Sequence, residues 1–157
     1  MSTPTSRRQK ILEWFLAHLQ TITVRNGFRT DAGERIYLNE IPELGPDDPD
    51  VAIALTAEPD ETSVNLMHVV IRLPLKIHAI AKVTLDDPVQ PWIAAEQVLS
   101  DVKEAIEQTD RTLGGLVLNR IERDQTETLP RVAGSLTVGV TIGYIAPYKE
   151  RWGNPAL

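Results

Sequence analysis

The chain has 157 residues, a formal net charge of −6 and no cysteine. Without cysteine there are no disulfides or thiolate metal sites, and no apolar run approaches the ~20 residues that span a bilayer. Eight acids and no lysine or arginine lie between positions 40 and 61, and the rest of the chain is close to neutral. This distribution argues against sequence-specific nucleic-acid binding, which needs a basic face.

The first predicted element is an amphipathic helix that begins after Ser6. Ser6 and Gln9 fit a capping box. Apolar residues then recur at helical spacing, at Ile11, Leu12, Phe15, Leu19 and Ile22. The basic residues before this stretch resemble a secretory signal, but Glu13 and His18 interrupt its apolar run and no small-residue cleavage site follows. We therefore expect a cytoplasmic protein.

The next segments predict two short strands joined by a rigid acidic loop. Residues 35–39 and 51–58 have the composition of strands, and Val51, Ile53 and Leu55 share one face of the second. Between them, "PELGPDDPD" holds three prolines and a glycine, which is typical of a loop. "PDETS" at 59–63 predicts a turn.

Residues 64–83 predict one further strand, with clean alternation in its second half. Leu75, Ile77 and Ala79 alternate with Lys76 and His78. Proline cannot donate to a ladder, so Pro74 predicts that the strand is an edge there or carries a bulge.

A second helix is predicted within residues 86–110, with Pro91 in its first turn, where a missing N–H costs nothing. Its apolar stripe comprises Ala95, Val98, Leu99, Val102 and Ile106. Residues 116–124 predict a strand, 125–131 a connection, 134–147 the last strand, and 148–157 a polar tail. The order α-β-β-β-α-β-β predicts one α+β domain over 1–157, with its core at about 6–147. We expect a mostly antiparallel or mixed sheet with both helices on one face.

The last strand, "GSLTVGVTIGYIAP", has one bulky apolar face and one nearly bare, uncharged face. Gly139 and Gly143 alternate with threonines on the bare face. A glycine inside a strand often marks a close approach by another backbone. Two candidates fit: one of the chain's own helices, whose Ala94, Ala95 and Ala105 are also small, or a neighbouring subunit.

No catalytic or metal-binding motif is evident in the sequence, so we expect no cofactor and no enzymatic activity. The three histidines lack ligand spacing. "GPDDPD" lacks the calcium-loop register, and Asp86 and Asp87 suit the positive end of the second helix. The alternative is a small hydrolase or ligand-binding domain whose site comes from scattered residues, namely His68, His78, Asp86 and Asp87.

Four segments occur in a characteristic order: the opening helix, the strand "LPLKIHAIAKV", the second helix leading through "LGG" to "LVLNRI", and the strand ending "TIGYIAP". In this order they resemble the tail terminator proteins of long-tailed bacteriophages and prophages, the minor tail protein U type. The resemblance covers roughly residues 6–147. It implies a structural virion assembly protein of the virion tail, made in the host cytoplasm, that closes into a ring, expected to be a hexamer. Such a ring caps the tail tube, stops its polymerisation and presents a docking surface to the head-side connector. The alternative is another neck or head–tail joining protein, because such proteins have a similar order of elements.

Under this resemblance, several residues are expected at contacts with a neighbouring copy, the tube protein or the connector. The acidic loop is expected to face a basic partner or the ring channel, although a solvated loop is the simpler reading. The arginines are expected to pair with an acidic patch next door, and the aromatics to anchor an interface. The candidate interface residues are Asp47, Asp48, Asp50, Arg120, Arg123, Arg131, Gly139, Gly143, Tyr144, Tyr148 and Trp152.

Overall fold

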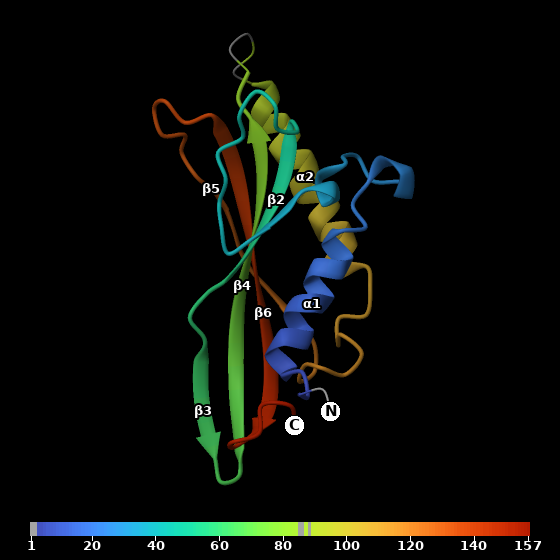
Figure 1. Cartoon of the computed structure of the whole chain (residues 1–157), viewed down its shortest axis with the longest axis vertical. Helices are drawn as coiled ribbons and strands as arrows, with labels where there is room; N and C mark the ends of the chain where they lie inside the picture. The colour runs from blue at the N-terminus through green and yellow to red at the C-terminus, as the bar shows by residue number, and fades with distance from the viewer. Residues whose placement is uncertain (1–2, 85–86, 88) are drawn as a thin grey trace.

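A computed structural model describes residues 3–84, 87 and 89–157 of the chain. It contains a mixed six-stranded sheet and two α-helices on one side of it, which confirms the predicted α+β class (Figure 1). The elements are α1 (Arg7–Leu19), β1 (Ile36–Leu38), β2 (Val51–Ala57), β3 (Glu61–Asn65), β4 (His68–Lys82), α2 (Gln90–Glu107), β5 (Glu122–Thr128) and β6 (Thr137–Arg151).

Two long antiparallel strands, β4 and β6, form the axis of the molecule (Figure 1). They pair along their whole length, from His68 opposite Arg151 to Lys82 opposite Thr137. The strand order is β1-β2-β4-β6-β5, and β3 pairs with the lower part of β4. Among the described strands, only the β1–β2 pair is parallel.

Both helices bury the stripes that the sequence predicts. Ser6 caps α1 by accepting a 3.1 Å hydrogen bond from the Gln9 backbone, so this half of the predicted capping box is confirmed. Ile11, Phe15 and Leu19 are fully buried. In α2, the five predicted stripe residues are buried and a proline stands in the first turn, as expected.

The alternation of β4 and β6 sorts their side chains onto two faces of the sheet. Leu75 and Ile77 of β4 and Val140 and Ile142 of β6 lie on the helix-covered face, in the main core. The opposite side, called here the second face, contains a much smaller cluster of Leu44, Ala52, Ala54 and Ile80, with Tyr37 packed against it.

The structure corrects the predicted order at one place, because residues 61–82 form a hairpin and not a single strand after a turn. β3 ends at Asn65, Leu66 and Met67 make the turn, and β4 begins at His68. No glycine or proline marks this turn, and Leu66 adopts a left-handed φ of +47°. The observed order is α-β-β-β-β-α-β-β.

Pro74 lies where neither β2 nor β3 pairs with β4, because β2 pairs as far as Leu75 and β3 begins at Arg72, so β4 is locally an edge on that side, as predicted. Its carbonyl accepts a 2.9 Å hydrogen bond from the Glu58 backbone. A strand residue directs its nitrogen and its carbonyl to the same side. The missing N–H therefore faces the short connection between β2 and β3, and the ladder with β6 loses no bond.

The last two strands also differ from their predicted bounds. β5 spans Glu122–Thr128, so the predicted strand at 116–124 and the connection after it are displaced towards the C-terminus. β6 continues to Arg151 and buries Tyr148, so the predicted polar tail from 148 is wrong in its first four residues. Pairing with β4 along its whole length extends β6 to Arg151.

Candidate functional site

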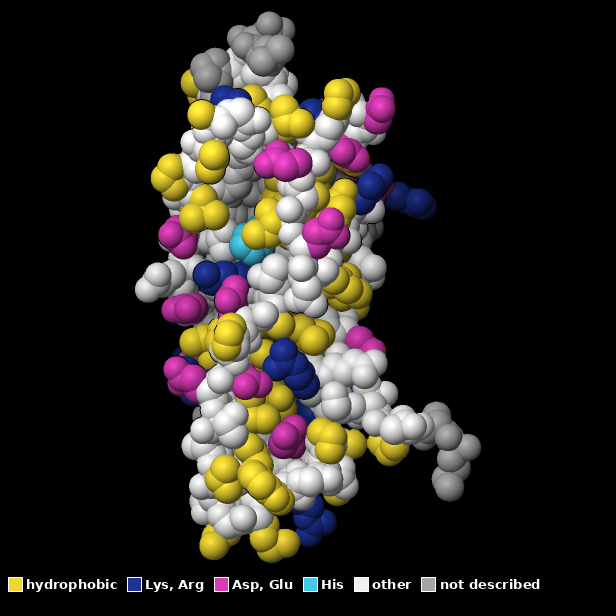
Figure 2. Space-filling view, turned by 60° about the vertical axis from the view of Figure 1, so that its left-hand side comes forward, with side chains coloured by type: hydrophobic (Ala, Val, Ile, Leu, Met, Phe, Trp, Pro, Cys, Tyr) yellow, Lys and Arg dark blue, Asp and Glu magenta, His cyan; other side chains and the backbone are white. Residues whose placement is uncertain are grey.

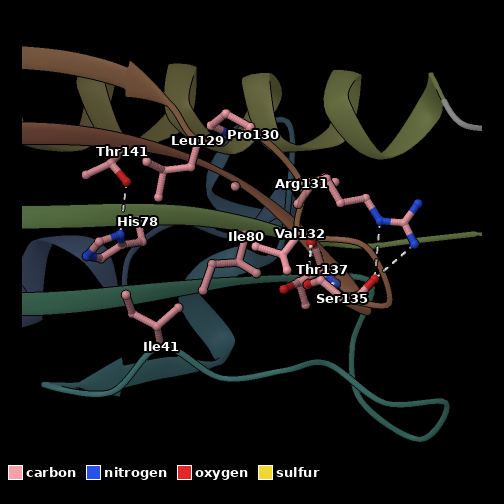
Figure 3. Close-up of a pocket in the computed structure, with 12 residues that line it drawn as sticks. Ile41, His78, Ile80, Leu129, Pro130, Arg131, Val132, Ser135, Thr137 and Thr141 are labelled. Atoms are coloured by element: carbon pink, nitrogen blue, oxygen red, sulfur yellow. Dashed lines mark hydrogen bonds between the residues drawn. The ribbon is translucent and has the colours of Figure 1, made fainter.

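The second face of the sheet is covered by connections, with no described helix upon it. The β1–β2 connection, residues 39–50, crosses one part of it, and the β5–β6 connection, residues 129–136, borders another. A hollow of about 230 Å³ lies between them. Ile41 lies across this hollow from Leu129 and Pro130, with Ile80 on its floor (Figure 3).

Apolar side chains around the hollow remain exposed to solvent. Val132 is 74% exposed, and Ile41 and Leu129 are exposed as well. Seen from this side, hydrophobic side chains spread along the molecule and gather at its lower end, with acids between them (Figure 2). Exposed apolar groups grouped around a depression are typical of an interaction surface.

Polar contacts hold the two connections in place. The Glu43 carboxylate accepts hydrogen bonds from the Leu136 backbone at 2.9 Å and the Ser135 hydroxyl at 3.0 Å. The Lys82 ammonium donates to the carbonyls of Pro46 and Asp48. The walls of the hollow are therefore tied to each other and to β4.

His78 lies on the floor of the hollow, between two threonines. Its Nδ1 is 2.9 Å from the Thr141 hydroxyl (Figure 3). Its Nε2 is 3.2 Å from the Thr56 hydroxyl. Burial, together with the Lys76 charge, lowers the pKa of His78 below its usual value, and the Glu58 charge opposes this shift. The neutral imidazole is thus favoured, with one ring nitrogen donating and the other accepting.

The two glycines on the bare face have different neighbours. Gly139 lines the hollow, and a Cβ there would lie 3.4 Å from the Ala79 carbonyl oxygen. A Cβ on Gly143 would lie 3.1 Å from Asp124 Cβ, where the register of β5 shifts between Arg123 and Thr126. The bulge in β5 therefore covers Gly143, and a hollow lies over Gly139. The alternative in which a helix covers this face is wrong.

The predicted acidic residues all lie in or beside the β1–β2 connection. Asp48 is half-buried, and its Oδ2 accepts a 2.8 Å hydrogen bond from the Gly45 backbone. Asp47 is exposed, and Asp50 is exposed at 3.9 Å from the Lys82 ammonium. Glu43 begins the predicted acidic loop, and its carboxylate accepts hydrogen bonds from Ser135 and Leu136.

The three predicted arginines do not lie together. Arg131 borders the hollow and donates to the Ser135 carbonyl at 3.0 Å. Arg123 forms a two-pronged ion pair with Glu107 at the end of α2. Arg120 is exposed in the connection before β5.

Two of the three predicted aromatic anchors belong to the core. Tyr144 and Tyr148 are each 1% exposed, so they are not surface anchors. Burial raises the pKa of the Tyr144 hydroxyl, which has no hydrogen-bond partner among the described residues. Trp152 is 66% exposed, and its backbone donates to the Met67 carbonyl at 3.1 Å. It lies beside the β3–β4 turn, at the lower end of the molecule.

The residue set proposed for a hydrolase or ligand site is not brought together. His68 begins β4 and His78 lies ten residues further along the same strand, a separation of roughly 33 Å. Asp87 accepts hydrogen bonds from the Val89 and Gln90 backbones at the start of α2. Asp86 lies outside the described residues.

Over the described residues 3–84, 87 and 89–157, no three His, Asp or Glu side chains are grouped so that they would hold a metal ion. Among the helices described, none has the length and apolar character needed to cross a membrane.

Sequence reasoning missed the tip of the β3–β4 hairpin. Val64, Leu66 and Met67 are exposed there, and Leu66 is 95% exposed. The sequence contains only a weak signal for this turn, since Asn65 is its one residue with turn preference.

Comparison of the chain with models of known protein families and with curated proteins finds no match.

Proposed function

We propose that this chain is a ring-forming tail terminator, which caps a phage tail tube, stops its growth and offers a docking surface to the head-side connector. The observation that carries the proposal is the second face of the sheet, where apolar side chains surround an open hollow without a covering helix. A lone subunit leaves this surface in water, and association with a copy buries it.

A ring requires two different patches on each subunit, because successive copies are related by rotation and meet head to tail. The second face supplies one patch. The lower end of the molecule, with exposed Val64, Leu66, Met67 and Trp152, supplies a dissimilar one. The resemblance in element order and the absence of a catalytic motif from the sequence are consistent with this structural role.

The β1–β2 connection also suits a surface that faces DNA or a basic partner. Glu40, Asp47 and Asp50 are exposed within it. Carboxylates that line a channel repel phosphates and so prevent passing DNA from adhering. In this role the acids act through their field and need no specific contact.

Electron microscopy tests the proposal. Purified chain is mixed with tail tubes from the virus or prophage whose genome carries it, and tubes without the chain serve as the control. We expect a ring at one end of each tube and tube lengths that no longer increase when tube protein is added. Bare tube ends and continued growth at saturating chain would refute the proposal.

A further inference from the structure

Leu66 occupies a position that is unfavourable for leucine in two separate ways. Its backbone lies in the left-handed region, with φ +47°, where asparagine and glycine are better tolerated. Its side chain is 95% exposed, so it gains nothing from the chain's own core. A left-handed backbone and an exposed apolar side chain are both unfavourable, and no contact with the described residues of the chain offsets them. Their combination points to a contact with another molecule.

We propose that the tip of the β3–β4 hairpin, Val64, Leu66 and Met67, docks into the hollow on the second face of a neighbouring copy. This inference rests on the proposed ring and names the contact that closes it. The tip projects beyond both helices at the lower end of the molecule (Figure 1). It is therefore free to reach another subunit.

The tip has no access to the hollow of its own chain. His68, next to the tip, and Ile80, on the floor of the hollow, lie twelve residues apart on β4, roughly 40 Å at the rise of a strand. β4 is continuously paired with β6 over this length, which keeps it extended. The two surfaces can meet only between copies, and such a contact is head to tail.

The chemistry of the two surfaces is complementary. The tip offers branched and thioether side chains, and the hollow of about 230 Å³ has walls of Ile41, Leu129, Pro130 and Val132 over Ile80. Apolar side chains that fill such a depression exclude water from both partners. An exposed leucine at the tip would be buried against these apolar walls.

The charges beside the tip are opposite to those of the β1–β2 connection, whereas Arg131, on the other wall of the hollow, has the same sign as the tip charges and donates to the Ser135 carbonyl. Lys149 and Arg151 lie on β6 next to the tip, facing the second side of the sheet, and form no ion pair within the described residues. Glu40 adjoins Ile41 in the wall of the hollow, and Asp47 is exposed in the same connection. Opposite charges at the rim orient two partners and speed their encounter.

Cysteine crosslinking tests the contact, because the chain has no cysteine of its own. A Met67→Cys chain and a Val132→Cys chain are mixed under mild oxidation, in solution and on tail tubes. We expect a disulfide between the two variants, faster than in either variant alone. The matched control replaces Val132→Cys by Val24→Cys, which is also exposed but follows α1, and we expect at least a tenfold slower crosslink.

A second variant, Leu66→Asn, separates docking from folding. Asparagine suits a left-handed turn position, so we expect the thermal midpoint to stay or rise while association weakens at least tenfold. Unchanged association of Leu66→Asn would overturn the proposed contact. Crosslinking of Met67→Cys with itself as fast as with Val132→Cys would do the same, because it would indicate a tip-to-tip contact.

The outcomes for the contact and for the tail function are distinguishable. Rings on tubes without the mixed crosslink would leave the terminator function standing and reject the hairpin contact. A mixed crosslink in solution with bare tube ends would support the contact and reject the function.

Discussion

Asp101 of α2 accepts two hydrogen bonds from Thr30, one from its backbone nitrogen at 2.9 Å and one from its hydroxyl at 2.8 Å. The carboxylate is fully buried and also accepts bonds from the backbone and the guanidinium of Arg29, each at 3.1 Å. This one side chain satisfies two backbone donors in the connection after α1 and holds that connection against α2.

Replacing Asp101 with alanine is expected to destabilise the chain by about 3 kcal/mol or more, because it leaves buried donors without an acceptor. Glu104→Gln is the matched control. Glu104 contacts the same arginine at 2.7 Å from a partly exposed position, and its loss should cost less than about 1 kcal/mol. Urea unfolding of the two variants measures the difference, and equal losses would contradict this account.

Gly33 has no room for a side chain. A Cβ would lie 2.4 Å from the Leu19 carbonyl oxygen and 2.7 Å from that of Ile22, both backbone atoms. Gly33→Ala is therefore expected to cost about 3 kcal/mol, at the upper end of overpacking effects. Gly139→Ala, with its nearest atom at 3.4 Å, should cost less, and thermal unfolding compares the two. A stable Gly33→Ala protein would show that the backbone there shifts freely.

Removing the Glu43 carboxylate is expected to loosen the wall of the hollow without unfolding the sheet. Glu43→Ala frees the Leu136 amide from its 2.9 Å bond, so exchange of that amide with solvent should accelerate at least tenfold. Glu40→Ala, an exposed acid in the same connection, serves as control. Amide hydrogen exchange by NMR reports both, and unchanged protection at Leu136 in Glu43→Ala would refute the role of this carboxylate.

Stability should fall on mild acidification, in part because of His78. The pKa of His78 is lowered in the folded chain, so the unfolded chain binds the proton more readily as pH falls below about 6.5. The contribution of His78 to folding stability is therefore fully present above that pH and is lost progressively as pH falls below it. His78→Gln should weaken the dependence of the urea midpoint on pH, relative to the unchanged chain. The range to measure is roughly pH 7.5 to 5.5, because it brackets the ordinary histidine pKa. Parallel slopes in the two proteins would exclude a contribution from His78.

The sequence alone predicts both helices, because their apolar residues recur at a local period and their first turns carry local signals, a serine cap in α1 and a proline in α2. Ser6, Pro91 and the stripe through Ile106 are all local signals of this kind. The alternation around Ile77 and the two unlike faces of the last strand are local as well, so the α+β class follows from them.

The candidate site depended on non-local contacts, which sequence periodicity does not report. The β3–β4 turn at Leu66 has Asn65 as its one turn-favouring residue, and it forms because both strands pair in the sheet. Tyr148 is buried, since β6 continues along β4 to Arg151.

The bare face of the last strand separates what the local sequence predicts from what depends on distant segments. Alternation establishes that Gly139 and Gly143 point away from the core, because side chains of a strand alternate strictly. What lies over each glycine depends on segments far away in the sequence, since a β5 bulge covers one and residues 39–50 and 129–136 surround the other. The sequence by itself determined the helices, the faces and the fold class, and only the tertiary structure decided the hollow and the projecting hairpin, because these arise from long-range strand pairing.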